Sequence, residues 1–249
     1  MERVSAEFMD EIIEDLQNKK IKYTFYVTGS TMVLKSKFGD FSHTRTGIKL
    51  SELPFINVVS RHIKKTKLPK LPHFTKDEID YYAYANLKGK QINNVFEVDI
   101  NAAYWKAALN LKIITKSIFD QGMKVDKITR LASLGSLAKN PTIVTFNGVE
   151  ESYERDKPAK TSYIWFAICN AVAEAMTEAK DLLGKDFIFF WVDGIYFRGK
   201  HNIKMVHKIF SEYNFESKLR KIDKLKFDYA NKHIIICEKG KKERPFPLI

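Results

Sequence analysis

The sequence predicts an α+β protein, and two observations carry this prediction. Segments with apolar residues at helical spacing are mixed with short segments in which apolar and polar residues alternate, as they do in strands. These segments follow one another through strand-to-helix, helix-to-strand and hairpin connections, so a strictly alternating, doubly wound sheet is not expected. With 249 residues, 45% of them hydrophobic, the chain is large enough to bury a full core.

The first ninety residues begin with a helix and a hairpin. Apolar residues at helical spacing predict an amphipathic helix over 5–19, and alternating residues over 23–27 and 32–34 predict a hairpin. The segment 61–72 is dense in Lys and Pro, which makes it the best linker candidate and a plausible phosphate-contacting strip. A Thr followed three residues later by Glu is a capping box, and it predicts a helix over 75–87.

The remainder of the chain alternates strands and helices. Strands are expected over 92–100, 142–146, 218–229 and 232–238, with a tight hairpin within 187–199. Short helices are expected over 102–121, and longer ones over 124–139, 159–183 and 202–213.

The charge of the chain is its most unusual property. There are 42 Lys and Arg against 30 Asp and Glu, a formal net charge of +12. Such an excess favours a polyanionic partner, most often nucleic acid, although a solvated basic surface without a partner also fits.

No uninterrupted apolar stretch of 18 residues occurs, and the N-terminus has no apolar run, so neither secretion nor a membrane span is expected. Cys169 and Cys237 lie in apolar segments, which favours two buried free thiols over a disulfide or a metal pair and fits a reducing cytosol.

Two aspartates end expected strands. Asp99 closes the strand 92–100, with Glu97 on the same side by alternation, and Asp193 sits in an Asp-Gly hairpin turn where Gly194 is expected to supply a positive φ. On its own the Asp-Gly pair also fits an ordinary turn facing solvent. Two carboxylates at the tips of adjacent strands would suit Mg²⁺ or Mn²⁺. Two such ions about 4 Å apart would activate a 3′-hydroxyl and stabilise the leaving pyrophosphate.

A basic helix over 124–139 adds a third feature. One face is shared, by spacing, by Lys127, Arg130, Leu131, Leu134 and Ala138. Two cations thus project from the same side and could hold a triphosphate. In isolation this segment also fits a solvated basic helix.

Together the three segments resemble family B DNA polymerases, particularly the compact viral and plasmid palms. Asp99 and Tyr104 keep the spacing of the Asp and Tyr of that family's first motif, and Lys127 to Gly135 reproduces the Lys and Gly spacing of its second. Asp193 takes the position of the metal-binding second Asp of its third motif. The matched region covers somewhat under half of the chain.

The resemblance implies an RRM-like polymerase palm with a small antiparallel sheet, helices on one face and abbreviated helical fingers. It implies that Asp99 and Asp193 bind Mg²⁺ or Mn²⁺, that Tyr104 is a steric gate against a ribose 2′-hydroxyl, and that Lys127 contacts the incoming triphosphate. Arg130 joins this set from helix geometry alone.

The same resemblance suggests how the chain is organised. The palm would span 91–249, with finger helices inserted at about 102–140, and the region 1–90 would pack on the palm. About 90 residues before the first motif leave no room for a proofreading exonuclease domain. Candidates for contacting primer phosphates are Lys239, Lys241 and Lys242.

The sequence also departs from the family pattern. Trp191 stands where the first Asp of the third motif would be, Leu131 replaces the Asn of the second motif, and Leu134 replaces its Tyr. These departures put efficiency or fidelity in doubt more than the type of reaction.

The expected function is DNA-directed DNA polymerase, which adds dNTPs to a primer 3′-hydroxyl on a DNA template, in the cytoplasm of a bacterium or a phage-infected host. Further replication subunits would supply a thumb or clamp. The alternatives are a catalytically inactive palm that serves as a DNA-binding scaffold subunit, or a template-independent or protein-priming nucleotidyltransferase.

Overall fold

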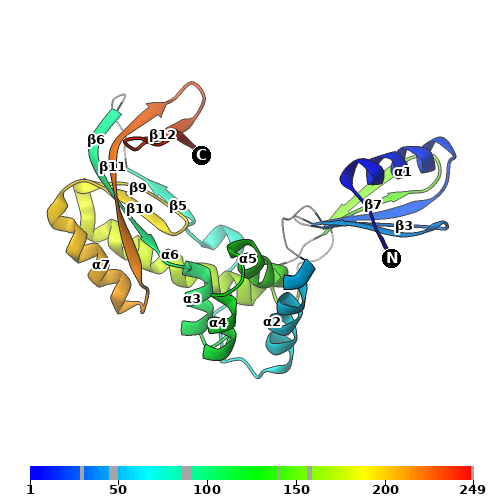
Figure 1. The fold of residues 1–249 in the computed structure, drawn as a ribbon, viewed down its shortest axis with the longest axis horizontal. Helices are drawn as coiled ribbons and strands as arrows, with labels where there is room; N and C mark the ends of the chain where they lie inside the picture. The colour runs from blue at the N-terminus through cyan, green and yellow to red at the C-terminus, as the bar shows by residue number, and fades with distance from the viewer. Residues whose placement is uncertain (29–30, 45–49, 86–90, 139–140, 156–158, 248–249) are drawn as a thin grey trace. The chain divides into compact units, whose positions relative to one another are not determined.

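The computed structural model describes residues 1–28, 31–44, 50–85, 91–138, 141–155 and 159–247. In these ranges the chain is an α+β protein, as predicted, with seven α-helices and two mostly antiparallel sheets (Figure 1). Contacts divide the chain into two compact units, each built from two segments. Residues 1–66 and 120–165 form the first unit, and residues 67–119 and 166–249 form the second. These cuts differ from the single boundary at residue 90 that the sequence suggested.

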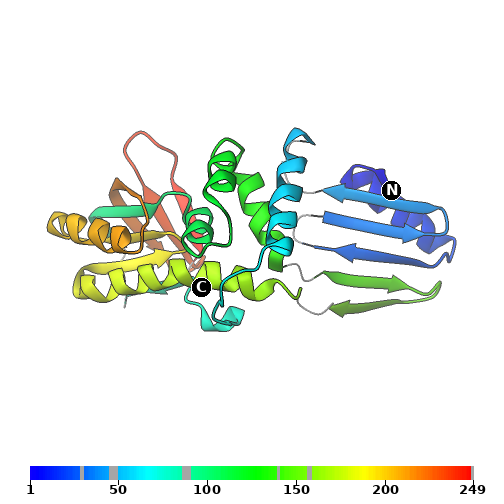
Figure 2. The same ribbon diagram turned by 90° about the horizontal axis from the view of Figure 1, so that it is seen from below.

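The first unit contains a six-stranded sheet with one helix, α1 (Ala6–Asn18), against one face, as Figure 2 shows behind the blue and green strands. The Ser5 side chain caps α1 by accepting a hydrogen bond from the Phe8 N–H group. Buried side chains of the helix pack on the sheet, and this core consists of Met9, Leu16, Tyr23, Met32, Leu34 and Phe146.

The strands of this sheet run in the order β1-β4-β3-β2-β7-β8, and only the β1–β4 pair is parallel. The expected hairpin and the strand 142–146 are confirmed, whereas β4 and the two edge strands were not foreseen. The bounds are β1 (Glu2–Arg3), β2 (Tyr23–Val27), β3 (Thr31–Ser36), β4 (Gly39–Thr44), β7 (Thr142–Phe146) and β8 (Glu151–Arg155).

The first unit also holds a pair of packed helices, α2 (Leu53–Lys65) and α5 (Lys127–Gly135), which lie side by side in Figure 1. The Glu52 carboxylate joins them. It accepts a hydrogen bond from the hydroxyl of the fully buried Thr129, and a longer one from the Asp126 N–H group at 3.3 Å. Helix α5 confirms the expected helix over 124–139 in its central part.

The second unit is a seven-stranded sheet in the order β13-β12-β11-β6-β10-β9-β5. Its last strands curl into half of a barrel, and α6 and α7 lie against the sheet in Figures 1 and 2. The strands are β5 (Tyr82–Tyr84), β6 (Gln91–Ile100), β9 (Phe187–Trp191), β10 (Gly194–Phe197), β11 (Ser217–Asp228), β12 (His233–Cys237) and β13 (Arg244–Pro247). Helices α3 (Ala103–Asn110) and α7 (Ile203–Glu212) lie wholly in this unit. The cuts between the units run through α4 (Lys116–Gly122) and α6 (Ser162–Leu183), and most of α6 belongs to this unit.

Most expected elements of this half are present, but the helix over 75–87 is wrong. Its capping box is real, since the Thr75 N–H group donates to the Glu78 carboxylate at 2.6 Å, yet it starts only a short 3₁₀ turn. The chain then becomes strand β5, which pairs with β9 so that Tyr82 lies opposite Trp191. Aromatic residues favour this edge position, and strand pairing overrides the local helix signal. Residues 86 and 87 of the expected helix lie outside the described ranges.

In the part of the chain that the structure describes, no helix is both long enough and apolar enough to cross a membrane. Cys169 and Cys237 are buried and form no disulfide, as the sequence predicted.

The Glu52 contact gives a test of how α2 and α5 hold together. Glu52→Ala leaves the buried Thr129 hydroxyl without its acceptor, so we expect the free energy of unfolding to fall by about 1–3 kcal/mol in urea titrations. Glu14→Ala, an exposed acid on α1, is the control and should change it by less than about 0.5 kcal/mol. Thr129→Val is then compared in the original chain and in the Glu52→Ala variant. If it lowers the free energy of unfolding by the same amount in both, the two side chains are not coupled and their contact does not contribute to stability.

Candidate functional site

The candidate site lies on strand β6, at the centre of the second unit's sheet. Asp99 on β6 is directly opposite Gly194 on β10 and Lys218 on β11. The next residue, Ile100, donates its N–H group to the Asp193 carbonyl at 2.9 Å. Residues in such contact across an antiparallel pair have Cα atoms roughly 5 Å apart. The two aspartates, 94 positions apart in sequence, therefore lie at the same end of the sheet, Asp99 on β6 and Asp193 in the turn that leads into the neighbouring strand β10.

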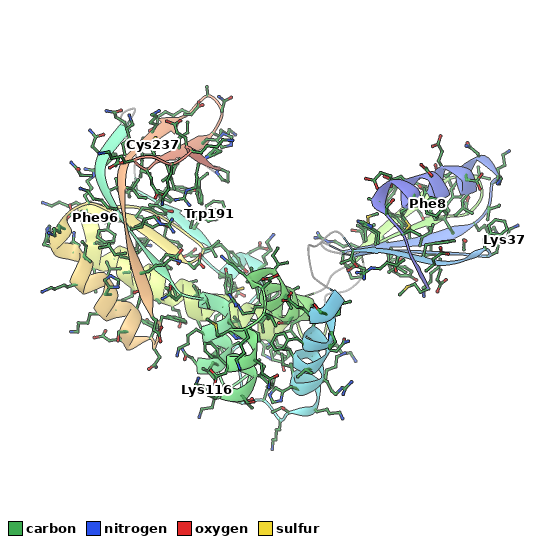
Figure 3. All side chains as sticks on the ribbon, in the orientation of Figure 1. Phe8, Lys37, Phe96, Lys116, Trp191 and Cys237 are labelled. Carbon is green, nitrogen blue, oxygen red and sulfur yellow. The ribbon has the colours of Figure 1, made fainter. Side chains whose placement is uncertain are left out.

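The sheet presents the Asp99 carboxylate away from its helices. Side chains alternate along a strand, so Asp99 shares a face with Glu97, whereas Phe96, Val98 and Ile100 point to the other. Helix α7 contacts β6 and β11, and Figure 3 shows Phe96 and Trp191 on opposite sides of the sheet. Trp191 pairs with Gly194, which in turn pairs with Asp99, so Trp191 belongs to the face of the acid.

Asp193 is held in a strained two-residue turn. Trp191 pairs with Gly194, so Val192 and Asp193 form the loop of the β9–β10 hairpin. Val192 has φ of 59°, a left-handed value that is rare and costly for a β-branched residue. The expectation that Gly194 supplies the positive φ is wrong, because Gly194 is the first residue of β10 and Val192 takes the strained position.

Two backbone hydrogen bonds fix this turn in place. The Val192 N–H group donates to the Tyr81 carbonyl at 2.7 Å, and the Asp193 carbonyl accepts from Ile100. One bond therefore anchors each of the two loop residues to a neighbouring segment. Strain of this kind persists where surrounding structure imposes it, and it is concentrated at functional sites.

Lys218 lies beside Asp99. Its ammonium nitrogen is 3.1 Å from an Asp99 carboxylate oxygen, and the lysine side chain is 54% exposed against 24% for the aspartate. An exposed lysine contributes little to stability through such a pair and can move away at small cost. The carboxylate is thus accessible to a competing cation.

A buried charge network extends from the site along the same face, and the sequence did not reveal it. Glu97 is only 3% exposed and its carboxylate lies 3.0 Å from Arg220 and 4.0 Å from Arg244. Burial raises the pKa of Glu97, and the two guanidinium groups and a hydrogen bond from the Tyr196 hydroxyl oppose that rise. The only sign of it in the sequence was that basic residues alternate along β11. The structure pairs two of them, Lys218 and Arg220, with the two acids of β6.

Tyr104 lies near Asp193. It is in the first turn of α3, which begins after Ala102, whose φ of 48° turns the chain sharply out of β6. Burial raises the pKa of the Tyr104 hydroxyl well above its usual range, and Cys169, Asp193 and Tyr81 raise it further. The phenol therefore stays protonated at neutral pH, within electrostatic reach of Asp193.

Cys169 on α6 belongs to the same surroundings. Burial raises the pKa of its thiol to about 12, and the contact with Tyr81 opposes this rise only in part. A thiol with so high a pKa is almost entirely protonated at neutral pH, which makes it a poor nucleophile or metal ligand. Cys169 therefore contributes to the packing of this region rather than to its chemistry.

Lys127 and Arg130 belong to the first unit, whereas both acids belong to the second. Lys127 is exposed at the start of α5. Arg130 is half-buried and donates to the carbonyls of Gly122 and Val125 at 3.2 and 3.0 Å, so its guanidinium closes the α4–α5 connection. Leu134, which shares the face of Lys127 and Arg130 by its spacing, is fully buried, so this face does not lie wholly in solvent.

The three C-terminal lysines lie between β12 and β13. Lys241 forms an ion pair with Glu238, which also binds Arg244 at 2.7 Å. Lys239 and Lys242 are exposed. The connection therefore presents cations, and Lys241 is partly neutralised within the chain.

The donor set of the site suits a magnesium-like ion that keeps water ligands. Within the described ranges, no three or more His, Cys, Asp or Glu side chains are close enough together to hold a metal. Asp99 on β6 and Asp193 in the β9–β10 turn offer two hard carboxylates at one end of the sheet. Mg²⁺ is commonly bound by one or two carboxylates together with water and substrate phosphates. The pair is thus compatible with a divalent ion that is shared with a substrate.

Neither a protein-family model nor a curated protein matches this sequence. The function is therefore inferred from the chemistry of the site.

The strained turn generates a test of the site's construction. Val192→Gly removes about 1–2 kcal/mol of left-handed strain and adds about 0.5–1 kcal/mol of unfolded-chain entropy. We expect the variant to be as stable as the original or up to about 1 kcal/mol more stable in urea titrations. The matched control Val33→Gly, at an ordinary strand position, should lose about 1 kcal/mol or more. A large loss at position 192 would mean that side-chain packing, not strain, dominates there.

Proposed function

We propose that this protein is a DNA-directed DNA polymerase of the family B type, and that its second unit is the palm. The observation that carries the proposal is that Asp99 on β6 and Asp193 in the β9–β10 turn lie at the same end of the sheet, where the Ile100 N–H group next to Asp99 donates to the Asp193 carbonyl. Carboxylates placed in this way suit nucleotidyl transfer assisted by Mg²⁺ or Mn²⁺.

The order of elements supports an RRM-like palm. Apart from α3, α4, α5, β7 and β8, which are inserted between β6 and α6, the α-helices and strands from β6 to β11 follow the order β6, α6, β9, β10, α7, β11. In the sheet these four strands lie side by side as β11-β6-β10-β9. This is the arrangement of the split βαβ, or ferredoxin-like, unit, with antiparallel neighbours throughout. In that arrangement β6 and the β9–β10 hairpin are the central elements, and they carry the two acids.

The residues present would serve the reaction in distinct ways. Asp99 and Asp193 would hold the divalent ions, which when bound would activate the primer 3′-hydroxyl and neutralise charge on the phosphates. Lys218 would leave Asp99 and turn to a phosphate oxygen, since its exposed side chain is free to reorient. Arg220 and Arg244, which remain partly exposed while paired with Glu97, would add positive potential to this face.

Tyr104 is proposed as the gate that excludes ribonucleotides. It lies in the first turn of α3, the helix that follows β6, and its hydroxyl lies within electrostatic reach of Asp193. A bulky side chain at this place would clash with a 2′-hydroxyl on the incoming sugar. It would thus select dNTPs over rNTPs by excluding the ribose rather than by binding the deoxyribose more tightly.

An inactive palm that serves as a DNA-binding scaffold is the second candidate. The ion pair between Lys218 and Asp99 favours it, because a lysine there lowers the demand for a metal ion. Trp191 favours it too, because the family resemblance places another acid at this position, next to the turn, and an apolar ring occupies it instead.

The central test is primer extension. With a primed DNA template, dNTPs and Mg²⁺ or Mn²⁺, we expect extension that EDTA abolishes. Asp99→Asn and Asp193→Asn should each lower the rate by at least about a hundredfold, because each removes a metal-binding carboxylate. Asp223→Asn, an exposed acid on β11 of the same sheet, is the control and should extend normally.

Binding separates the two candidates. Both site variants should bind DNA at least as well as the original, since each loses a negative charge. DNA binding without any extension would support the scaffold. Extension that is equally fast without a template would contradict template direction and support untemplated nucleotidyl transfer.

The gate has its own test. Tyr104→Ala should incorporate ribonucleotides at least about tenfold more readily relative to deoxyribonucleotides, because the ring that excludes the 2′-hydroxyl is gone. Tyr104→Phe keeps the ring and should keep the discrimination. The measurement is the ratio of kcat/KM for dNTP and rNTP, and an unchanged ratio in the alanine variant would remove this role from Tyr104.

A further inference from the structure

Helix α2 in the first unit has two contrasting faces. Val59 and Ile63 are buried, and α2 packs against α5. On the outward side, Asn57, Arg61 and Lys64 follow one another at intervals of four and three residues, so they share one exposed face. Because the apolar side is anchored, the polar face is fixed in orientation.

The outward face is shaped as well as charged. It contains a shallow hollow of about 340 Å³, and every side chain that lines it is polar or cationic: Asn57, Ser60, Arg61, Lys64 and Lys65. The set offers several hydrogen-bond donors and includes no carboxylate. Such a lining favours an anion with many acceptor oxygens over an apolar ligand.

The three cations of the hollow are not neutralised by the described part of the chain. No ion pair there includes Arg61, Lys64 or Lys65, whereas Lys19, Lys226 and Lys241 elsewhere each bind a nearby carboxylate. All three are exposed. Positive charge is thus left concentrated on one helix face.

We infer that α2 binds the phosphate backbone of duplex DNA through this face, without reading its sequence. From residue 57 to residue 65 the helix rises about 12 Å, which matches the rise of about three nucleotides of one strand. Arg, Lys, Ser and Asn side chains are the usual partners of phosphate oxygens, and such contacts position a protein on DNA without specifying bases. The inference rests on the proposed function for its choice of DNA, but its readout is binding and not extension.

Cations near the C-terminal end of a helix also stabilise the helix, and this structural role must be distinguished from DNA binding. Lys64 and Lys65 lie in the last turn of α2, where positive charge interacts favourably with the helix dipole. Arg61 lies a turn earlier, and the hollow extends back to Asn57, beyond the reach of that effect. Measuring both thermal stability and DNA affinity therefore distinguishes helix stabilisation from phosphate binding.

The test compares two triple variants of the full chain. Arg61, Lys64 and Lys65 are replaced by Gln on α2, and Lys200, Lys204 and Lys208 are replaced by Gln at α7, so both variants lose the same charge. Binding to a fluorescent duplex of about 25 base pairs is followed by anisotropy at several salt concentrations, and thermal unfolding is recorded for each variant.

We expect the α2 variant to bind about tenfold or more weakly at 0.1 M salt, with a plot of log K against log salt that is shallower by about 3 units. The α7 variant should change the affinity less than about threefold. An Arg61→Lys variant keeps the charge and should bind like the original. The inference is overturned if the α2 variant binds like the original, if the two triple variants weaken binding equally, or if the original does not bind duplex DNA. Binding with no extension would instead contradict only the polymerase.

Discussion

The register of β6 between β10 and β11 is the constraint on which the rest of the site depends. Asp99 lies opposite Gly194 on one side and Lys218 on the other. Because side chains alternate, a slip of one residue would turn Asp99 and Glu97 into the layer that α7 packs against and bring Val98 and Ile100 to the open face. The cost of burying unpaired carboxylates there makes such a slip unfavourable, so the hydrophobic pattern of β6 and its acids enforce the same pairing.

The buried Glu97 strengthens this pairing from within. A carboxylate that is 3% exposed must be paired, and Arg220, directly opposite on β11, supplies the partner. Replacing such a pair by apolar residues is often neutral for stability, whereas breaking it is strongly destabilising. Its effect is therefore to specify the register, while the pinned and strained turn at Val192 specifies where Asp193 lies.

The two units thus offer different chemistry. The second unit gathers acids, a protonated tyrosine and paired arginines around one end of a sheet, which suits a reaction on a phosphate. The first unit presents cations on the outer face of α2 that no described carboxylate pairs with, which suits a contact with a backbone of phosphates. A net charge of +12 fits both, because each would act on a polyanion.

The sequence predicts most of the helices and strands, the two buried thiols and the acid at the end of β6, because periodicity and strand-end signals act over a few neighbouring residues. It did not determine strand β5, whose identity comes from pairing with β9, or the inward position of Leu134 on α5. It also did not reveal that Arg130 closes the α4–α5 connection or that Glu97 is bound by Arg220, 123 residues away. Burial and ion pairing depend on which segments meet, and only the tertiary structure decides that.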